Sequence, residues 1–252
     1  PEGQVAVQVK FESDSDWIHL KFIKDHLDEN GIPAELILPY LPYSRMDRKE
    51  EQRLFTLKSI CGFINGLNFR SVTIWEPHSE VGVALLDKVR VINKTKELCL
   101  TAMAHLTALP ETAGEEEILC AANNQGIYLV YPDAGAAKRY SKQFPYSKIL
   151  ECSKERDFNT GAIRSLQISG PEKICCSAAV IVDDLCSRGG TFQLTASRLK
   201  EKYGIERICL AVTHCEDTVF HGEVLTDVLI DKVYTTNSIL SGRHEKLIVT
   251  EF

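Results

Sequence analysis

The sequence contains no apolar stretch long enough to cross a membrane and no excess of positive charge. Its longest apolar run, residues 177–182, ends at Asp183 and Asp184, well short of the ~18 to 20 residues of a membrane-spanning helix. Lysine and arginine number 29 against 35 aspartates and glutamates, a net charge of −6, so binding to nucleic acid would need a local basic patch. The composition therefore predicts a soluble protein with neither a membrane nor a nucleic-acid partner.

The sequence also lacks the cysteine spacings of a disulfide framework or a zinc site. Its nine cysteines are an odd number, and none of them form a CxxC pair. Disulfide frameworks are typical of small secreted chains, and zinc sites need closely spaced ligand pairs. We therefore expect reduced cysteines in the core and a cytoplasmic location.

Apolar strand-like and amphipathic helix-like segments alternate along the 252 residues, of which 44% are hydrophobic. This alternation predicts an α/β fold with two domains, each a mainly parallel sheet flanked by helices. The stretch from residue 94 to residue 124, with an acidic loop at Glu115–Glu117, is the expected junction, so the domains are residues 1–93 and 94–252. The chain begins at Pro1, and a strand-like pattern in Val5–Phe11 follows at once. We therefore expect the first domain to be truncated at its start.

One apolar strand ends in two carboxylates and is followed by a glycine-rich turn and a helix. Asp183 and Asp184 can accept hydrogen bonds from vicinal sugar hydroxyls. Gly189 and Gly190 let backbone N–H groups approach a phosphate at the helix start, and Thr191 adds a hydroxyl. The alternative is an Asp-Asp turn with a Gly-Gly bend and a threonine cap. The fixed order of these pieces favours the phosphate site.

This window resembles the phosphoribosyl-diphosphate binding motif of type I phosphoribosyltransferases and of ribose-phosphate pyrophosphokinases. Further segments resemble pyrophosphokinase motifs in the family's order, and a plain transferase would not carry them all. They are LPYLPYSRMDRK (Leu38–Lys49), EPHSE (Glu76–Glu80), YPDAGAAKR (Tyr131–Arg139) and Lys154–Arg156. AVTHCE (Ala211–Glu216) also resembles the strand that follows the ribose-phosphate helix in the family. The resemblance to ribose-phosphate pyrophosphokinases covers most of the chain and implies two phosphoribosyltransferase-like domains.

The family's reaction moves the β,γ-diphosphoryl group of ATP to the anomeric hydroxyl of ribose 5-phosphate and releases AMP. Its rate comes from positioning and from neutralisation of charge by Mg²⁺, lysine and arginine. The resemblance implies that Lys154 and Arg156 are the catalytic residues. They fall in the polar stretch Cys152–Thr160, which we expect to be a mobile loop that closes over the reactants. Without the resemblance, this stretch is an ordinary solvated surface run.

The resemblance also assigns binding residues. His78 and Asp133 are implied to hold Mg²⁺ and the diphosphate. The implied ATP-binding residues are Glu2, Gln4, Arg45, Asp47, Arg48 and His78. The implied diphosphate-binding residues are Asp133, Ala134, Gly135 and Ala136. The implied ribose-phosphate-binding residues are Asp183, Asp184, Ser187, Arg188, Gly189, Gly190 and Thr191. Glu2 and Gln4 occupy positions that contact adenine across a subunit interface in the family, so a homo-oligomer, a dimer or a hexamer, is expected.

The chain departs from the family at two informative places. Met46 stands where relatives usually have glutamine in the adenine site. The ribose-phosphate loop commonly has the sequence Asp-Thr-x-Gly-Thr, but here it is Ser187–Thr191, with arginine at position 188. Because the guanidinium fork suits additional phosphate oxygens, we hypothesise an acceptor with more than a monophosphate at its 5′ end. ADP-ribose is one such acceptor, and its product can serve NAD biosynthesis. The alternative is that Arg188 pairs with a surface acid.

Two other functions fit parts of the sequence. The chain can be a non-catalytic relative that regulates an active pyrophosphokinase, although such proteins typically lose the basic catalytic segment that Lys154 and Arg156 retain. It can also be a type I phosphoribosyltransferase that uses only the segment around Asp183 and Gly190. The motifs around Arg45 and His78 would then be coincidences.

Overall fold

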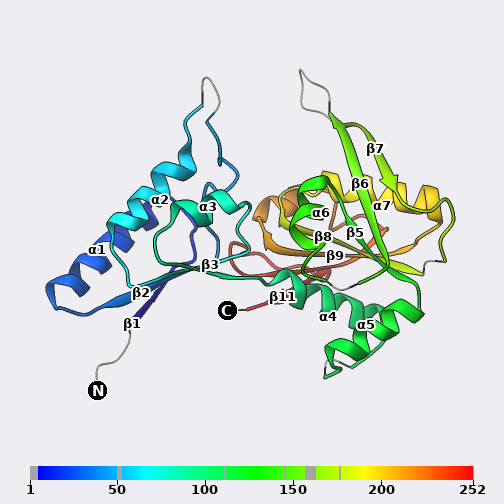
Figure 1. The fold of residues 1–252 in the computed structure, drawn as a ribbon, viewed down its shortest axis with the longest axis horizontal. Helices are drawn as coiled ribbons and strands as arrows, with labels where there is room; N and C mark the ends of the chain where they lie inside the picture. Colours follow the sequence, from blue (N-terminus) through cyan, green and yellow to red (C-terminus); the bar gives the residue numbers. More distant parts are fainter. Residues whose placement is uncertain are drawn as a thin grey trace. The chain divides into compact units, whose positions relative to one another are not determined.

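The computed structural model describes residues 5–49, 53–110, 112–144, 146–156, 163–175 and 177–251, and for residues 155, 156 and 163–165 it describes the backbone alone. Figure 1 shows its helices and strands. The chain divides into two compact units, Pro1–Lys94 and Thr95–Phe252. Both units consist of parallel or mainly parallel sheets with helices, so the predicted α/β fold is confirmed.

The first unit is built on a four-stranded parallel sheet in the order β1-β2-β3-β4. Leu36, Leu38 and Ile74 fill its core together with apolar side chains from the helices. The strands are β1 (Val5–Gln8), β2 (Ala34–Leu38), β3 (Val72–Trp75) and β4 (Val89–Ile92). The helices are α1 (Ser15–Glu29), α2 (Thr56–Gly66) and α3 (Glu80–Leu85).

Three sequence-based details of the first unit are wrong. The strand expected over Val5–Phe11 ends at Gln8. The spacing of Leu54 with Leu57, Cys61, Ile64 and Leu67 predicts Leu54 on the apolar face of α2, but Leu54 precedes the helix and is 71% exposed. The spacing of Ile23 with Trp17, Leu20 and Leu27 likewise predicts Ile23 on the buried face of α1. Ile23 is exposed instead, while Lys24 is buried with its ammonium over the Phe69 ring. The long apolar stem of the lysine fills the position that the pattern gave to isoleucine.

The second unit is built on a seven-stranded sheet in the order β11-β10-β9-β8-β5-β6-β7. All neighbours are parallel except β6 and β7, which pair antiparallel and form the long hairpin in Figure 1. The first strands along the chain are β5 (Ile127–Tyr131), β6 (Ile149–Arg156) and β7 (Ile163–Ser169). The others are β8 (Ala178–Cys186), β9 (Arg207–Cys215), β10 (Ile230–Thr236) and β11 (Leu247–Thr250).

Helices cover both faces of this sheet, and the alternation along β8 shows how. Ala179 and Ile181 pack in the core that includes residues of α7 (Gly190–Tyr203). Val180 and Val182 pack in the other core, to which the remaining helices contribute. Those helices are α4 (Thr95–Thr107), α5 (Glu115–Asn124) and α6 (Ala134–Tyr140). Because successive side chains of a strand point to opposite faces, a continuous apolar run is needed in a strand that is buried on both sides.

The acidic segment Glu115–Glu117, expected as a loop, is instead the first turn of α5. Three carboxylates at a helix N-terminus interact favourably with the partial positive charge of the unpaired backbone N–H groups. The helix therefore begins where the sequence suggested a break.

The eight cysteines that the structure describes are free thiols, as the sequence predicts. Six of them are buried, but Cys120 and Cys175 are exposed, so the expectation that the cysteines are core residues is wrong for these two. In the described part of the chain, no helix combines the length and the apolar character needed to cross a membrane.

The turn between β8 and α7 is held tightly by a neighbouring loop. Gly189 has φ +82°, and a Cβ atom there would lie 1.9 Å from Val224 Cγ2. A Cβ atom on Gly222 would lie 1.9 Å from the carbonyl oxygen of Arg188. By contrast, a Cβ atom on Gly190 would meet nothing within 4 Å. The backbone at residues 188 and 189 is therefore fixed by close approach, which only glycine permits.

We expect Gly189→Ala to destabilise the protein by about 2 to 4 kcal/mol, because it combines a left-handed backbone with a steric clash. The matched control is Gly190→Ala, which introduces the same methyl group one residue later in open space. It should change the free energy of unfolding by less than about 1 kcal/mol, in the stabilising direction, since alanine favours the helix. Urea unfolding measures both changes. Equal unfolding midpoints for the two variants would contradict the assigned geometry of the turn.

Candidate active site

Charged side chains gather where three neighbouring strands of the second unit end. Asp183 and Asp184 lie near the carboxyl end of β8, Asp133 follows β5, and Lys154 lies on β6. These strands are adjacent and parallel, so their carboxyl ends share one edge of the sheet. In parallel α/β sheets this edge is where ligands bind.

Asp133 begins helix α6 and interacts with two donors. Its Oδ1 accepts a hydrogen bond from the Ala136 N–H at 3.0 Å, and its Oδ2 accepts one from the Lys154 ammonium at 2.9 Å. Burial raises the pKa of Asp133, but these two donors outweigh it, so the pKa lies below its usual value. The carboxylate is 39% exposed while the Lys154 side chain is 7% exposed, so Asp133 keeps an open side.

The structure corrects the expected conformation of the basic segment. Residues 152–156 are part of strand β6 rather than a loop, and they pair with β7. The polar composition of this segment suits an edge hairpin, in which side chains alternate between the core and solvent: Cys152 is buried and Ser153 is exposed. Residues 157–160 of the expected loop lie outside the described residues, and Arg156 is described by its backbone alone.

Asp184 forms a buried ion pair with Arg139 of α6, a residue that the sequence analysis did not assign to the site. The Arg139 guanidinium contacts Asp184 Oδ1, and the two side chains are 21% and 6% exposed. Burial alone lowers the pKa of Arg139, but the Asp184 carboxylate raises it above its usual value. Arg139 falls within the YPDAGAAKR segment, six residues after Asp133. Its position on the short helix that begins at Asp133 is the feature of the sequence that could have indicated a role in the site.

Asp183 has no cation within ion-pair distance among the described residues. It is half-buried, and its Oδ1 accepts a hydrogen bond from the Asp184 N–H at 2.9 Å. Burial, followed by the Asp184 and Asp133 carboxylates, raises the pKa of Asp183 well above its usual value. The site therefore combines three carboxylates with the two cations Lys154 and Arg139.

The turn at Ser187–Thr191 leads from this cluster into α7. Arg188 and Gly190 are exposed, while Ser187 and Thr191 are half-buried. The first turn of α7 carries no acidic side chain. Within the part of the chain that the structure describes, the Arg188 side chain forms no ion pair or hydrogen bond. The alternative that Arg188 pairs with a surface acid thus has no support among these residues.

The ATP-binding residues expected in the first unit follow two adjacent parallel strands. Arg45, Asp47 and Arg48 lie in the loop after β2, and His78 lies shortly after β3. Arg45 and Arg48 are exposed, His78 is half-buried, and the Asp47 side chain is 12% exposed. His78 thus lies close to the carboxyl end of its strand, whereas the other three residues lie farther along the loop that follows β2. Glu2 and Gln4 lie outside the described residues.

The segment before His78 is anchored by Glu76. This residue is buried, has φ +36°, and accepts a hydrogen bond from the Lys94 N–H at 2.9 Å through its Oε2. A positive φ at a residue other than glycine is unfavourable, and the surrounding contacts must hold it. His78 therefore follows a backbone that is fixed rather than free.

The diphosphate segment begins α6. Ala134 and Gly135 are exposed, whereas Ala136 is buried and donates its N–H to Asp133. No group of three or more histidine, cysteine, aspartate or glutamate side chains capable of holding a metal occurs among the described residues. A closed protein cage for a metal is therefore not found there.

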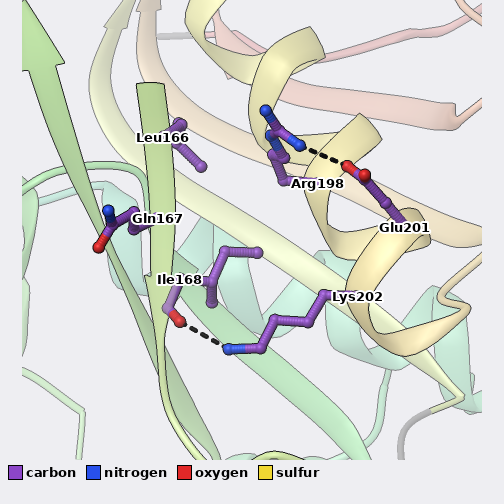
Figure 2. Close-up of a pocket in the computed structure, with 6 residues that line it drawn as sticks. All are labelled: Leu166, Gln167, Ile168, Arg198, Glu201 and Lys202. Carbon is purple, nitrogen blue, oxygen red and sulfur yellow. Dashed lines mark hydrogen bonds and ion pairs between the residues drawn. The ribbon is translucent and has the colours of Figure 1, made fainter. Parts of the chain in front are cut away.

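A separate cavity of about 470 Å³ lies between β7 and α7 (Figure 2). Leu166 and Ile168 of β7 face it, together with Arg198 and Lys202 of α7. Arg198 pairs with Glu201 at 2.6 Å, and the Lys202 ammonium donates to the Ile168 carbonyl oxygen at 2.8 Å. Arg198 and Lys202 belong to the second half of α7, away from its start at the Ser187–Thr191 turn, whereas Leu166 pairs with Lys154 of β6 across the hairpin.

Comparison with known proteins gives several relatives. The chain is 28% identical over 239 residues to a ribose-phosphate pyrophosphokinase of Sulfurisphaera tokodaii. This alignment covers 90% of the chain and 72% of that protein. It is 25% identical over 249 residues to a ribose-phosphate pyrophosphokinase of Sulfolobus acidocaldarius. That alignment covers 94% of the chain and 76% of the relative. No family model matches the chain.

The crystal structure of phosphoribosylpyrophosphate synthetase from Mycobacterium smegmatis superposes with a TM-score of 0.74. The sequences are 17% identical, and the match covers 98% of this chain and 77% of that one. The two proteins therefore share a fold.

We expect Asp183→Asn to raise the melting temperature by a few degrees at neutral pH. The folded-state pKa of Asp183 lies above its unfolded value, so ionisation of Asp183 costs the wild-type protein stability as the pH rises through and above the unfolded pKa. The amide removes this cost, and the gain should vanish near pH ~4 and grow toward pH ~8.

The matched control is Asp133→Asn, for which the sign is opposite. The pKa of Asp133 is lowered, so its carboxylate stabilises the folded protein above the unfolded pKa, and this stabilisation is lost as the pH falls through the folded pKa. Asp133→Asn should therefore be less stable than the wild type at neutral pH and equally stable in acid. Thermal unfolding across the pH range measures both, and a stability loss for Asp183→Asn at neutral pH would refute the charge assignment.

Proposed function

The chain belongs to the ribose-phosphate pyrophosphokinase family, and we propose that it transfers the β,γ-diphosphoryl group of ATP to the anomeric hydroxyl of ribose 5-phosphate, releasing AMP. One observation carries the proposal. The ion pair between Lys154 and Asp133 brings the expected catalytic lysine to the expected diphosphate segment. Asp183 and Asp184 lie on the neighbouring strand.

In this proposal each charged group has a distinct task. Asp183 and Asp184 accept hydrogen bonds from the ribose hydroxyls and orient the sugar. The turn from Ser187 to Thr191 receives the 5′-phosphate at the start of α7, where backbone N–H groups attract an anion. Lys154, with Arg156, neutralises the charge that develops on the migrating diphosphoryl group. Lys154 is already seated at the site through Asp133.

The donors present suit a magnesium ion that is held mainly by substrate. Asp133 is ionised and has an exposed side, so in the second unit it would hold the ion together with the diphosphate. Mg²⁺ typically takes one or two carboxylates and completes its shell with phosphate oxygens and water. When bound, the ion would supply charge neutralisation.

The two domains divide the substrates in this proposal. Residues 1–93 form the ATP side, where Arg45, Asp47, Arg48 and His78 meet the nucleotide. Glu2 and Gln4, if they act as in the family, contact adenine from a second subunit. Residues 94–252 hold the diphosphate and ribose-phosphate segments. We place the protein in the cytoplasm as a homo-oligomer, a dimer or a hexamer.

A second acceptor, ADP-ribose, is favoured by one observation. Arg188 is exposed and has no side-chain partner among the described residues, while its backbone is fixed by Gly222. An exposed guanidinium on a fixed backbone can meet phosphate oxygens beyond the first phosphate of the acceptor. The protein would then act on a ribose phosphate that is extended at its 5′ end, and its product would serve NAD biosynthesis.

We expect the wild-type protein to release AMP from ATP and Mg²⁺ in the presence of a ribose phosphate, with a product that gains two phosphoryl groups by mass spectrometry. Lys154→Met should lower kcat by roughly 100- to 1000-fold, the usual effect of removing a group that stabilises transition-state charge. The matched control is Lys202→Met, whose ammonium bonds to a backbone carbonyl near the separate cavity. It should keep its kcat.

Two outcomes of this assay would contradict the proposal. Absence of AMP release from the wild type with every ribose phosphate would favour a non-catalytic regulatory relative. Release of diphosphate from the activated sugar and a base without ATP would indicate a phosphoribosyltransferase instead.

The ADP-ribose alternative predicts a higher kcat/KM with ADP-ribose than with ribose 5-phosphate, whereas the main proposal does not. Arg188→Ala should lower the ADP-ribose value by about tenfold, the effect of one hydrogen bond between charged groups, and leave the ribose 5-phosphate value within about twofold. Arg198→Ala, which removes an arginine from the separate cavity, is the control. Equal rates with the two acceptors would exclude ADP-ribose as the preferred substrate.

A further inference from the structure

We propose that Arg139 is a positioning residue for the acceptor sugar. Its ion pair with Asp184 ties the helix that begins at the diphosphate segment to the strand that ends in the ribose-binding acids. The inference rests on the proposed function, because it assigns a purpose to the link between these two binding segments. Arg139 acts through Asp184 and touches neither substrate.

The pair is placed where it can hold a fixed geometry. The Asp184 side chain is 6% exposed and the Arg139 side chain 21% exposed, so water competes little for either group. Removing one partner of a buried pair is strongly destabilising, because the other charge is left unpaired. The contact is therefore made only with both partners present, and it fixes α6 against β8.

Arg139 also contacts the buried ring of Tyr140. Its guanidinium lies 5.6 Å from the centre of the Tyr140 ring. The Tyr140 hydroxyl lies 3.4 Å from Thr95 Oγ1, which in turn lies 3.0 Å from Thr213 Oγ1. Tyr140, Thr95 and Thr213 are fully buried. Buried polar contacts of this kind make a site rigid, so the position of Arg139 is set by α4 and β9 as well as by its own helix.

Both ends of α6 are thus tied to charges of the site. At its start, Asp133 pairs with Lys154 of β6, and near its end Arg139 pairs with Asp184 of β8. A shift of α6 along its axis would break both pairs together. The acceptor hydroxyl and the diphosphate must meet within a few tenths of an ångström of the productive geometry, and this double attachment supplies that constraint from the protein side.

The experiment is a double-mutant cycle on Arg139→Met and Asp184→Asn, with Arg139→Lys as the conservative variant. We expect each single variant to raise KM for ribose 5-phosphate by roughly 10- to 100-fold, the range for hydrogen bonds to charged groups, with KM for ATP within about twofold of the wild type. The double variant should lose no more than the worse single variant, because both substitutions remove one interaction. Lysine keeps the charge without the planar fork and should restore part of the loss.

Arg198→Met is the matched control, since Arg198 forms an ion pair with Glu201 in the same unit but near the separate cavity. It should leave both KM values unchanged. Circular dichroism establishes that each variant is folded. Asp184→Asn and Arg139→Lys, which preserve size and hydrogen bonding, keep the test valid if Arg139→Met does not fold.

Several outcomes would overturn the inference. Additive losses in the cycle would mean that Arg139 acts independently of Asp184. An equal rise of the two KM values, or a lower melting temperature with unchanged KM, would mean that the pair is purely structural. The double-mutant cycle is repeated with the dissociation constant for ribose 5-phosphate as the measured quantity. A wild type that binds this sugar without releasing AMP would refute the proposed function alone, and one that does not bind it would refute both.

Discussion

The partial neutralisation of three carboxylates by two cations, at one edge of the seven-stranded sheet, is the constraint on which the site depends. Asp133, Asp183 and Asp184 come from two neighbouring strands, and their mutual repulsion opposes folding. Lys154 and Arg139 neutralise Asp133 and Asp184, and each arrives from a different element. Asp183 has no such partner among the described residues. The repulsion therefore acts most strongly on Asp183, which in the proposed function accepts hydrogen bonds from ribose hydroxyls together with Asp184.

The sequence predicts this arrangement where a local rule decides it. Acids after an apolar strand lie at a carboxyl end, and parallel strands bring their carboxyl ends to one edge. Asp133, Asp183 and Asp184 could therefore be placed from the pattern alone. The α/β alternation likewise fixes the fold class, because strands buried on both faces must be apolar throughout.

Other features depend on contacts between distant residues, which a linear pattern does not contain. The partner of Asp184 lies 45 positions earlier in the chain, at Arg139. Strand pairing extends β6 through residues 152–156, whose polar composition alone indicates a loop. Lys24 replaces Ile23 in the core because its stem reaches Phe69 and its ammonium pairs with Asp28. In each case tertiary contact outweighs the local preference.

The turn from Ser187 to Thr191 combines a constrained backbone with an exposed side chain at position 188. Gly222 lies so close to the Arg188 carbonyl, and Gly189 so close to Val224, that the backbone path is set by the neighbouring segment. The side chain at position 188 nevertheless points into solvent-accessible space. Substitutions there need not disturb the fold, since the backbone does not depend on that side chain. In the proposed function, an arginine at this position can therefore meet additional phosphate oxygens while the start of α7 stays in place.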